Sequence, residues 1–232
     1  MRFIFTSLFL AVLAFASPLA AADRPVVVEL FTSQGCSSCP AADKILAKLA
    51  KQDNVIALSL HVDYWDYLGW KDSFAKAMFS MRQRAYARAA QKHTIYTPQV
   101  VVQGASHAIG NREQDVNNLI KFHAAQTKAV ALDVARYGND LIVNIRAISG
   151  PVGAAVVEIV RYMPERTVDI RAGENAGRKI VYTNIVTDWQ PMAQWNGRSG
   201  LTVKTTITGT DPVVILVQSK DYGPIIAAKV LR

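Results

Sequence analysis

The only two cysteines of this 232-residue chain lie two residues apart, in the segment Cys36-Ser37-Ser38-Cys39, and Pro40 follows them. A pair at this spacing can pass between dithiol and disulfide without rearranging the rest of the chain. We expect Cys36, as the more exposed of the two, to be the nucleophile and Cys39 to resolve the mixed disulfide. A static cross-link and half of a metal site are the alternatives. So short a loop constrains an unfolded chain little, and zinc would need four ligands where no second such pair exists.

The flanking residues predict the elements that position the cysteines. Val26–Phe31 is an apolar run typical of a buried strand, and apolar residues spaced three and four apart predict a helix over Pro40–Lys51. The first sulfur would then lie near the helix N-terminus, where unpaired N–H groups and the helix dipole favour the thiolate. Pro40 suits the first helical turn because its missing N–H costs nothing there.

A buried acid is predicted beside the cysteines. Glu29 stands inside the first predicted strand, where a carboxylate is costly unless it is used or paired. We expect Glu29 to accept the proton of Cys39 during exchange. The alternative is a structural carboxylate that is simply paired.

His61 and Asp63 end a second predicted strand, Val55–Val62, on the side where the cysteines should lie. With two thiolates, His61 could complete a Cu(I) site, but we favour a histidine at a strand end that hydrogen-bonds backbone. An aromatic cluster follows and would form either the rim of a peptide-binding groove or a lid over the core. Its members are Tyr64, Trp65, Tyr67 and Trp70.

A long amphipathic helix is predicted from Ser73 to about Gln91, and its polar face includes Arg82. The predicted apolar stripe consists of Phe74, Ala77, Met78, Met81, Ala85 and Ala89. Strands at Val100–Gln103 and near Ser106–Ile109 and a last helix follow. This order of strand, cysteine helix, strand, helix, proline loop, hairpin and helix is that of the thioredoxin fold.

The segment from Val26 to about Thr127 accordingly resembles a thioredoxin-type domain. In that superfamily the proline of a Thr-Pro pair is cis and faces the cysteines. The resemblance implies this role for Pro98, with Thr97 presenting its backbone to a substrate chain by strand-like pairing. An ordinary proline at a strand entrance is the alternative.

Nearly the whole chain also resembles a family of secreted bacterial proteins known only as domain of unknown function 1223. The similarity rests on four segments, Glu29 to Pro40, His61 to Asp66, Tyr96 to Gln99 and Gly173 to Arg178. It implies a fold but no established substrate.

After about Lys128 the sequence changes to short strands separated by turn signals, as in a small antiparallel sandwich. Strands are expected at Ala129–Ala135, Leu141–Ala147, Ala154–Tyr162, Thr167–Arg171, Lys179–Trp189, Leu201–Thr208, Val213–Gln218 and Ile225–Val230. We read the loop from Gly173 to Arg178 as turn chemistry, with Glu174 pairing Arg178. The predicted fold class is an α/β thioredoxin-like domain, residues 23–127, followed by an all-β, sandwich-like region, residues 128–232.

The N-terminus predicts export. Residues 1–22 combine a positive start, an apolar run and Ala20-Ala21-Ala22, as in a cleaved signal peptide. The apolar run falls short of the roughly 20 residues that a membrane anchor would need. We therefore expect a periplasmic or secreted protein, a location where disulfides persist. The formal charge of +8 is spread along the chain and no nucleic-acid motif accompanies it.

Together these features predict an exported thiol–disulfide oxidoreductase that needs no cofactor or metal. Its partners would be protein thiols and disulfides or a redox partner, with no nucleic acid and no membrane span after signal cleavage. The predicted catalytic residues are Cys36, Cys39, Pro98, Thr97 and Glu29. A copper-binding or metallochaperone module using Cys36 and Cys39, and a non-enzymatic envelope scaffold, stay open as alternatives.

Overall fold

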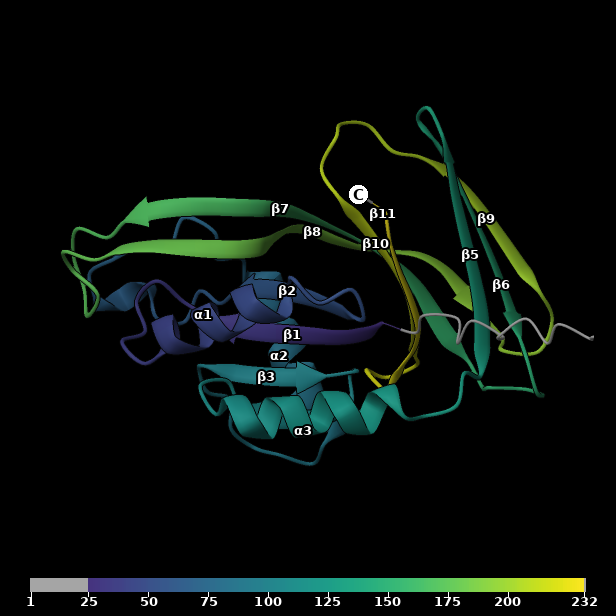
Figure 1. Ribbon diagram of the computed structural model, residues 1–232, viewed down its shortest axis with the longest axis horizontal. Helices are drawn as coiled ribbons and strands as arrows, with labels where there is room; N and C mark the ends of the chain where they lie inside the picture. Colours follow the sequence, from purple (N-terminus) through teal and green to yellow (C-terminus); the bar gives the residue numbers. More distant parts are fainter. Residues whose placement is uncertain (1–24, 232) are drawn as a thin grey trace, which may run out of the picture.

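The computed structural model describes residues 25–231, so the predicted signal peptide lies outside the described residues. Within this range the protein is a sheet-dominated, mixed α/β structure with three α-helices and two sheets (Figure 1). The first half contains β1 (Val26–Thr32), α1 (Cys39–Leu49), β2 (Val55–His61), the 3₁₀ segment η1 (Asp66–Leu68), α2 (Ala77–Ala89), β3 (Gln99–Val102), β4 (Ser106–Ile109) and α3 (Glu113–Ala124). The second half contains β5 (Val130–Tyr137), β6 (Asp140–Ala147), β7 (Ala155–Asp169), β8 (Lys179–Trp195), β9 (Leu201–Thr206), β10 (Val213–Ser219) and β11 (Ile225–Leu231).

One sheet runs through both halves. Its eight strands lie in the order β11-β10-β7-β8-β2-β1-β3-β4. β1 and β2 are parallel over seven residues, whereas β8 joins β2 through a single parallel register pair, Ser59 with Ile185. The long antiparallel ribbon of β7 and β8 extends over the first half in Figure 1. Strands from either side of residue 128 therefore share one hydrogen-bonded sheet.

The helices cover both faces of the central strands. Alternate residues of β1 point to opposite faces. Val28 and Leu30 pack with α1 and α3, whereas Val27 and Phe31 pack with α2. All seven residues of β1 and of β2 are buried, as expected for parallel strands covered on both sides. The carboxyl ends of these two strands, at Thr32 and His61, lead directly into the loops of the cysteine site.

The buried face of α2 differs from the predicted stripe. Phe79 and Tyr86 are buried, Met81 is 58% exposed, and Arg82 is buried rather than solvated. The reason is that the sheet carries polar partners for this helix. Arg82 donates a hydrogen bond to Glu29, and Gln83 donates one to Gln99. Hydrophobic spacing could not reveal these pairs, because it treats every polar side chain as solvent-facing.

The second half, residues 130–231, contains only strands among its regular elements. The small sheet, in the order β5-β6-β9, packs on β7, β10 and β11 around a common apolar core that includes Val143, Ile215 and Trp195. The prediction of two strands between residues 154 and 171 was wrong, because β7 continues without a break from Ala155 to Asp169. Its partner β8 has 17 residues against 15 in β7, and the ladder between them continues past Tyr162 with a register shift between Arg161 and Tyr162.

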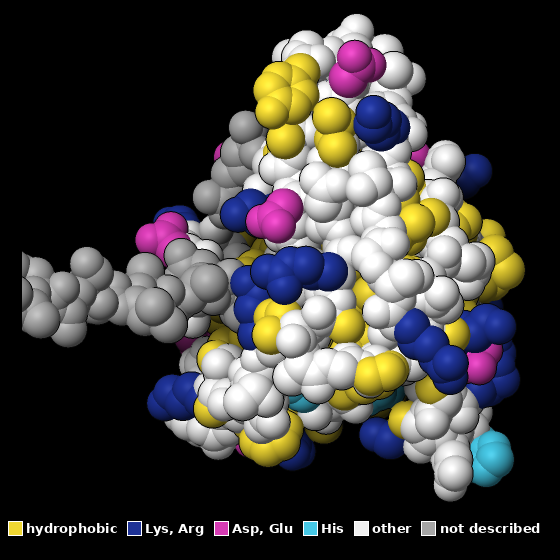
Figure 2. Space-filling view, turned by 90° about the vertical axis from the view of Figure 1, so that its right-hand side faces the viewer, with side chains coloured by type: hydrophobic (Ala, Val, Ile, Leu, Met, Phe, Trp, Pro, Cys, Tyr) yellow, Lys and Arg dark blue, Asp and Glu magenta, His cyan; other side chains and the backbone are white. Residues whose placement is uncertain are grey.

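The surface charge is dispersed at the end of the molecule formed by the small sheet. Figure 2 shows Lys and Arg side chains there interspersed with hydrophobic and acidic ones rather than gathered in one patch. Across residues 25–231, none of the helices combines the length and hydropathy that crossing a bilayer requires.

Candidate functional site

Cys36 and Cys39 form a disulfide at the start of α1. Their Sγ atoms are 2.18 Å apart and their Cα atoms 5.4 Å apart. Cys36 is 4% exposed and Cys39 is fully buried, so Cys36 is the more accessible of the two but lies just beneath the surface. α1 begins at Cys39, whose N–H bonds to the carbonyl of Cys36, and Pro40 occupies the first turn. The Ser38 hydroxyl lies 3.4 Å from Cys36 Sγ, which places a potential donor beside that sulfur.

A loop from the second half holds the backbone around the cysteines. Asn175 Nδ2 donates to the carbonyls of Gln34 and Cys36, at 2.9 Å each. The Glu174 carboxylate accepts the N–H of Ser37 at 3.0 Å, and hydrogen bonds from Ser37 lower the pKa of Glu174. The predicted pairing of Glu174 with Arg178 is therefore wrong, because Glu174 is engaged with the cysteine loop. The segment that we read as simple turn chemistry forms part of the site.

Gly173 allows this loop to approach closely. Its φ of +75° favours glycine, and a Cβ there would meet Trp70 Cβ at 3.1 Å. Trp70 Nε1 in turn donates to Gln34 Oε1 at 2.8 Å. The backbone N–H of Gln34 donates to Asp72 Oδ2 at 2.8 Å, so this residue before the cysteines is fixed through both its backbone and its side chain.

The Thr97–Pro98 peptide bond is cis, and it lies close to the cysteine helix. A Cβ built on Gly110 would lie 3.0 Å from Pro98 Cβ and 3.1 Å from Ala42 Cβ, so proline and helix converge on that glycine. Trp65 also contacts this region, because its Nε1 donates to Thr97 Oγ1 at 2.7 Å. The structure therefore brings Thr97 and Pro98 to the side of the site where α1 begins.

The aromatic residues after β2 line this site. Trp65 packs against Gly35, with 3.3 Å between Trp65 Cβ and an ideal Cβ there, and Tyr67 stacks on Trp65 at 6.4 Å between ring centroids. Tyr67 is 77% exposed. Tyr64 instead turns toward α2, where burial raises its pKa to about 12 and its hydroxyl donates to Gln83. The cluster thus divides into site-lining and core-facing members.

Buried polar groups lie behind the cysteines, on the α1 face of the sheet. Asp43 is on α1 four residues after Cys39 and is only 5% exposed. Thr32 Oγ1 donates to Asp43 Oδ1 at 2.9 Å, while burial raises the pKa of Asp43 to about 7. Asp43 can therefore exchange a proton near neutral pH, which an ordinary aspartate cannot.

His61 forms the second part of this buried polar group. Its Nδ1 lies 2.7 Å from Asp72 Oδ2, the same oxygen that accepts the N–H of Gln34. Phe74 and Tyr182 pack edge-on against the imidazole. Among the residues described, several buried polar atoms here find no hydrogen-bond partner within the protein. They are Asp43 Oδ2, Ser59 Oγ, His61 Nε2 and Tyr182 Oη.

Glu29 does not lie with the cysteines. Its carboxylate accepts from Arg82 Nε at 2.7 Å and from the Tyr86 hydroxyl at 2.6 Å, both on α2. α1 covers the opposite face of β1, so Glu29 cannot receive the Cys39 proton directly. We correct the assignment accordingly. Glu29 is the paired structural carboxylate that was the alternative interpretation.

His61 and Asp63 do not join the cysteine pair in a metal site, because each has another partner. His61 pairs with Asp72. Asp63 accepts from the Ser80 hydroxyl at the start of α2. Within residues 25–231, no three His, Cys, Asp or Glu side chains converge in a group that could hold a metal ion. A Cu(I) site with His61 as third ligand therefore has no geometric support here.

The fold and site define a sheet-dominated α/β protein with a CxxC disulfide at a helix start. The chain belongs to the DUF1223 family, proteins of unknown function, whose family profile matches residues 27–218. A crystal structure of a protein from Agrobacterium tumefaciens is 34% identical, with a TM-score of 0.76, over 89% of this chain and 93% of that one.

Two more distant similarities accompany this match. HBP35 of Porphyromonas gingivalis shares the fold, with a TM-score of 0.59 at 15% identity, over 90% of this chain and 75% of that one. A probable thioredoxin of Archaeoglobus fulgidus is 45% identical over 38 residues, which are 16% of this chain. That match spans 42% of the thioredoxin, less than half of its length.

Sequence reasoning missed Asp43, Asn175 and Glu174. Asp43 left a signal, since an acid four residues after Cys39 shares its face of the predicted helix and that face is otherwise apolar. The only sequence signal for Asn175 and Glu174 was that they lie in a segment typical of the family. Their contacts to residues 34–37 span about 140 positions and depend on how β7 and β8 lie over the sheet.

Proposed function

We propose that this protein is a thiol–disulfide oxidoreductase of the thioredoxin type that acts through Cys36 and Cys39. The observation that carries the proposal is the disulfide at the start of α1 with the protonatable, buried Asp43 one turn behind it. The β1-α1-β2-α2-β3-β4-α3 order and the short match to a probable thioredoxin support a thioredoxin-like unit in residues 23–127. The division of the chain near residue 128 into this unit and an all-β region, residues 128–232, belongs to the same proposal, with strands of both regions sharing one sheet.

In the reducing direction the Cys36 thiolate attacks one sulfur of a substrate disulfide. A Cys36–substrate disulfide forms, and the other substrate sulfur leaves as a thiolate. Cys39 then loses its proton and attacks Cys36 Sγ, which releases the second substrate thiolate and restores the Cys36–Cys39 disulfide. Two electrons pass from the dithiol to the substrate, and every step is reversible.

Asp43 is the proton acceptor in this scheme. A thiol must ionise before it attacks, and Cys39 is fully buried, where water cannot take its proton. Asp43 follows Cys39 by one helical turn, and its pKa of about 7 suits an acid–base group at neutral pH. Thr32 holds one carboxylate oxygen, and the other has no partner within the part of the chain that the structure describes.

Substrate positioning falls to Thr97, Pro98 and Trp65. Pro98 lacks an N–H that would compete for the sulfur atoms. The half-buried Thr97 precedes it, with its side chain fixed by Trp65. The exposed Tyr67, stacked on Trp65, would contact an apolar residue of the substrate chain. Substrates are proposed to be protein thiols or disulfides in the periplasm or outside the cell, where such exchange is needed.

The test is activity in both directions, as insulin reduction with dithiothreitol and as oxidation of a reduced, unfolded protein. We expect wild-type protein and Lys44→Ala, an exposed control on α1, to be active in at least one assay. Cys36→Ser should be inactive, and Cys39→Ser should accumulate a mixed disulfide visible by mass spectrometry. Wild-type protein inert in both assays, or Cys36→Ser as active as wild type, would refute the proposal.

A further inference from the structure

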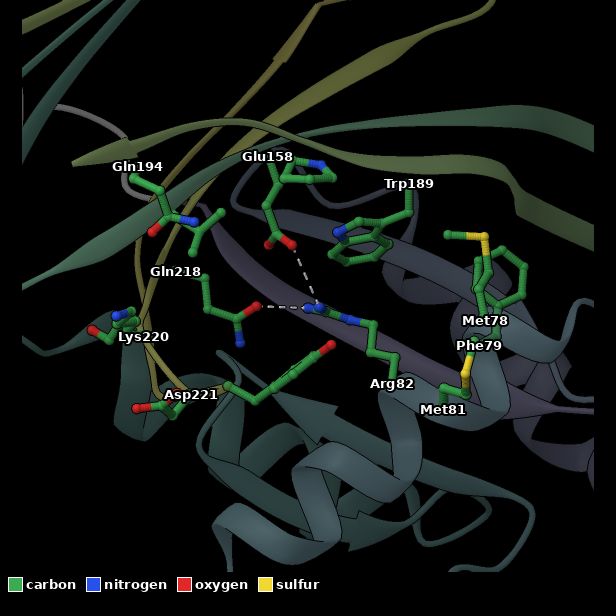
Figure 3. A pocket seen from close by; sticks show the side chains of 14 residues that line it. Met78, Phe79, Met81, Arg82, Glu158, Trp189, Gln194, Gln218, Lys220 and Asp221 are labelled. Atoms are coloured by element: carbon green, nitrogen blue, oxygen red, sulfur yellow. Dashed lines mark hydrogen bonds and ion pairs between the residues drawn. The ribbon is translucent and has the colours of Figure 1, made fainter.

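A cavity of about 520 Å³ opens on the opposite face of the sheet from α1, between α2 and the strands of the second half. Figure 3 shows it from close by, with Arg82 reaching up from α2 and Glu158 and Trp189 reaching down from β7 and β8. Small-molecule sites in proteins occupy roughly 300–1,000 Å³, so the cavity has the size of a ligand site. It shares no residue with the cysteine site.

The walls of the cavity are apolar. Met78, Phe79 and Met81 come from α2, and Trp189 and Pro191 come from β8. Met81 lines the cavity and is 58% exposed, so a molecule bound in the cavity would cover it. Methionine side chains adapt their shape to what they contact. These walls therefore suit an apolar body such as an aromatic ring.

The floor of the cavity is polar and incompletely paired. Arg82 is held by Glu29, Tyr86 and Gln218 through its Nε and Nη2 atoms, and its guanidinium lies 3.7 Å over the Trp189 ring. Its Nη1 atom is 3.9 Å from Glu158 Oε1, too far for a hydrogen bond.

Two further atoms at this floor are only weakly paired. Among residues 25–231, neither Glu158 Oε2 nor Trp189 Nε1 has a partner within ordinary hydrogen-bond distance, although both atoms are buried. Burial raises the pKa of Glu158, while Arg82 and a hydrogen bond from the Trp189 side chain oppose that shift, so the indole N–H and the carboxylate face each other. A weak pair of this kind costs free energy when buried, so a bound group that bridges the donor and the acceptor would be favoured.

We infer that this cavity binds a neutral small molecule with an apolar body and a head group that both donates and accepts hydrogen bonds, such as an amide or a hydroxyl. The head group would accept from Trp189 Nε1 or Arg82 Nη1 and donate to the Glu158 carboxylate. A carboxylate ligand would face Glu158, and an ammonium ligand would face Arg82, so both are disfavoured. The inference is independent of the cysteine chemistry.

The backbone conformation at the rim of the cavity indicates that the cavity is a specific feature of the fold and not a defect in packing. Asp221 and Tyr222 line the mouth, and both adopt positive φ, 58° and 57°, although neither is glycine. Such conformations cost free energy and persist only where the surrounding structure enforces them. The turn places the Tyr222 ring 5.7 Å from the Arg82 guanidinium, on the rim of the same floor.

Four matched probes with one aromatic ring test the inference in the full mature chain: phenylacetamide, phenylethanol, phenylacetate and phenethylamine. Binding is measured by chemical-shift titration, read at the backbone N–H groups of the lining residues Met81 and Asp221 in every variant, and also at the Trp189 indole N–H where that residue is kept. We expect the amide or the alcohol to bind at least about tenfold more tightly than either charged probe. Trp189→Phe should weaken the neutral probes severalfold, and Glu158→Gln should remove the discrimination against phenylacetate. Glu165→Gln, an exposed carboxylate on the same strand, should change neither.

The outcomes are decisive in both directions. Preference for a neutral probe that depends on Trp189 and Glu158 supports the site. No binding of either neutral probe, or selectivity unchanged in Glu158→Gln and Trp189→Phe, overturns it and leaves a water-filled hollow. Circular dichroism of each variant verifies that it is folded. Because these assays use no thiol chemistry, their failure is distinct from failure of the proposed redox function.

Discussion

Asp43→Asn should change how the stability of this protein depends on pH. The carboxyl group is buried beneath α1 and faces Thr32, His61 and Tyr182, with Asp72 behind the imidazole. Burial is the largest cause of its raised pKa, and the nearby His61 opposes the shift. Asparagine keeps the shape and the acceptor for Thr32 but cannot ionise. The substitution therefore removes one titration and leaves the packing in place.

The magnitude follows from the two pKa values of Asp43. The pKa rises from 3.8 in the ordinary state to about 7 in the folded protein. Because the folded pKa is the higher one, the folded state binds this proton more tightly. Its stabilising effect is complete below about pH 4 and is lost as the pH rises to about 7. The loss is about 1.4 kcal/mol per pH unit between these values, and about 4 kcal/mol in all as an upper bound.

Urea unfolding followed by tryptophan fluorescence measures this effect in the oxidised protein, at intervals between about pH 4 and about pH 8. We expect the free energy of unfolding of Asp43→Asn to exceed that of wild type at pH 8 and to converge with it near pH 4. Asp53→Asn replaces an exposed carboxyl in the loop before β2 and serves as the control. Parallel curves for wild type and Asp43→Asn would refute the reasoning about the buried acid.

Two further outcomes are expected. Glu174→Ala should speed amide hydrogen exchange at Ser37, measured by NMR, because the N–H loses its acceptor, whereas Arg178→Ala in the same loop should not. Arg82→Met should destabilise the protein to urea by about 3–5 kcal/mol, because Glu29 is left buried without its cation. Adding Glu29→Gln to that variant should recover part of the loss. No recovery would show that the cost lies in packing.

The elements near the cysteines could be predicted because their signals are local. The apolar run before Cys36, the helical spacing after Cys39 and the Thr97-Pro98 pair each depend on a few neighbouring residues. The structure places β1, α1 and β3 within one or two residues of the expected bounds. What failed was the buried face of α2, because burial of Arg82 depends on Glu29, 53 positions away in the sequence.

The roles of the buried acids could not be predicted from local sequence patterns for the same reason. Glu29 and Asp43 are both buried acids near the cysteines in sequence, and composition alone cannot rank them. Their roles separate only when alternation along β1 is combined with the helix that covers each face. Glu29 then meets the cation on α2, whereas Asp43 enters a space with unpaired polar atoms. The charge of Glu29 is compensated by a fixed cation, whereas burial raises the pKa of Asp43.

The continuous sheet also explains why the cysteine loop depends on residues far beyond it. β8 lies beside β2, and the loop that joins β7 to β8 carries Asn175 to the carbonyls of Gln34 and Cys36. A helix start with a reactive sulfur must keep its backbone fixed, because a small shift of the loop changes which N–H groups face that sulfur. In this protein the first half supplies the sulfur atoms and Asp43, and the second half supplies the donor that fixes the loop. Chemistry at Cys36 should therefore respond to changes at Asn175 even though the two residues are 139 positions apart.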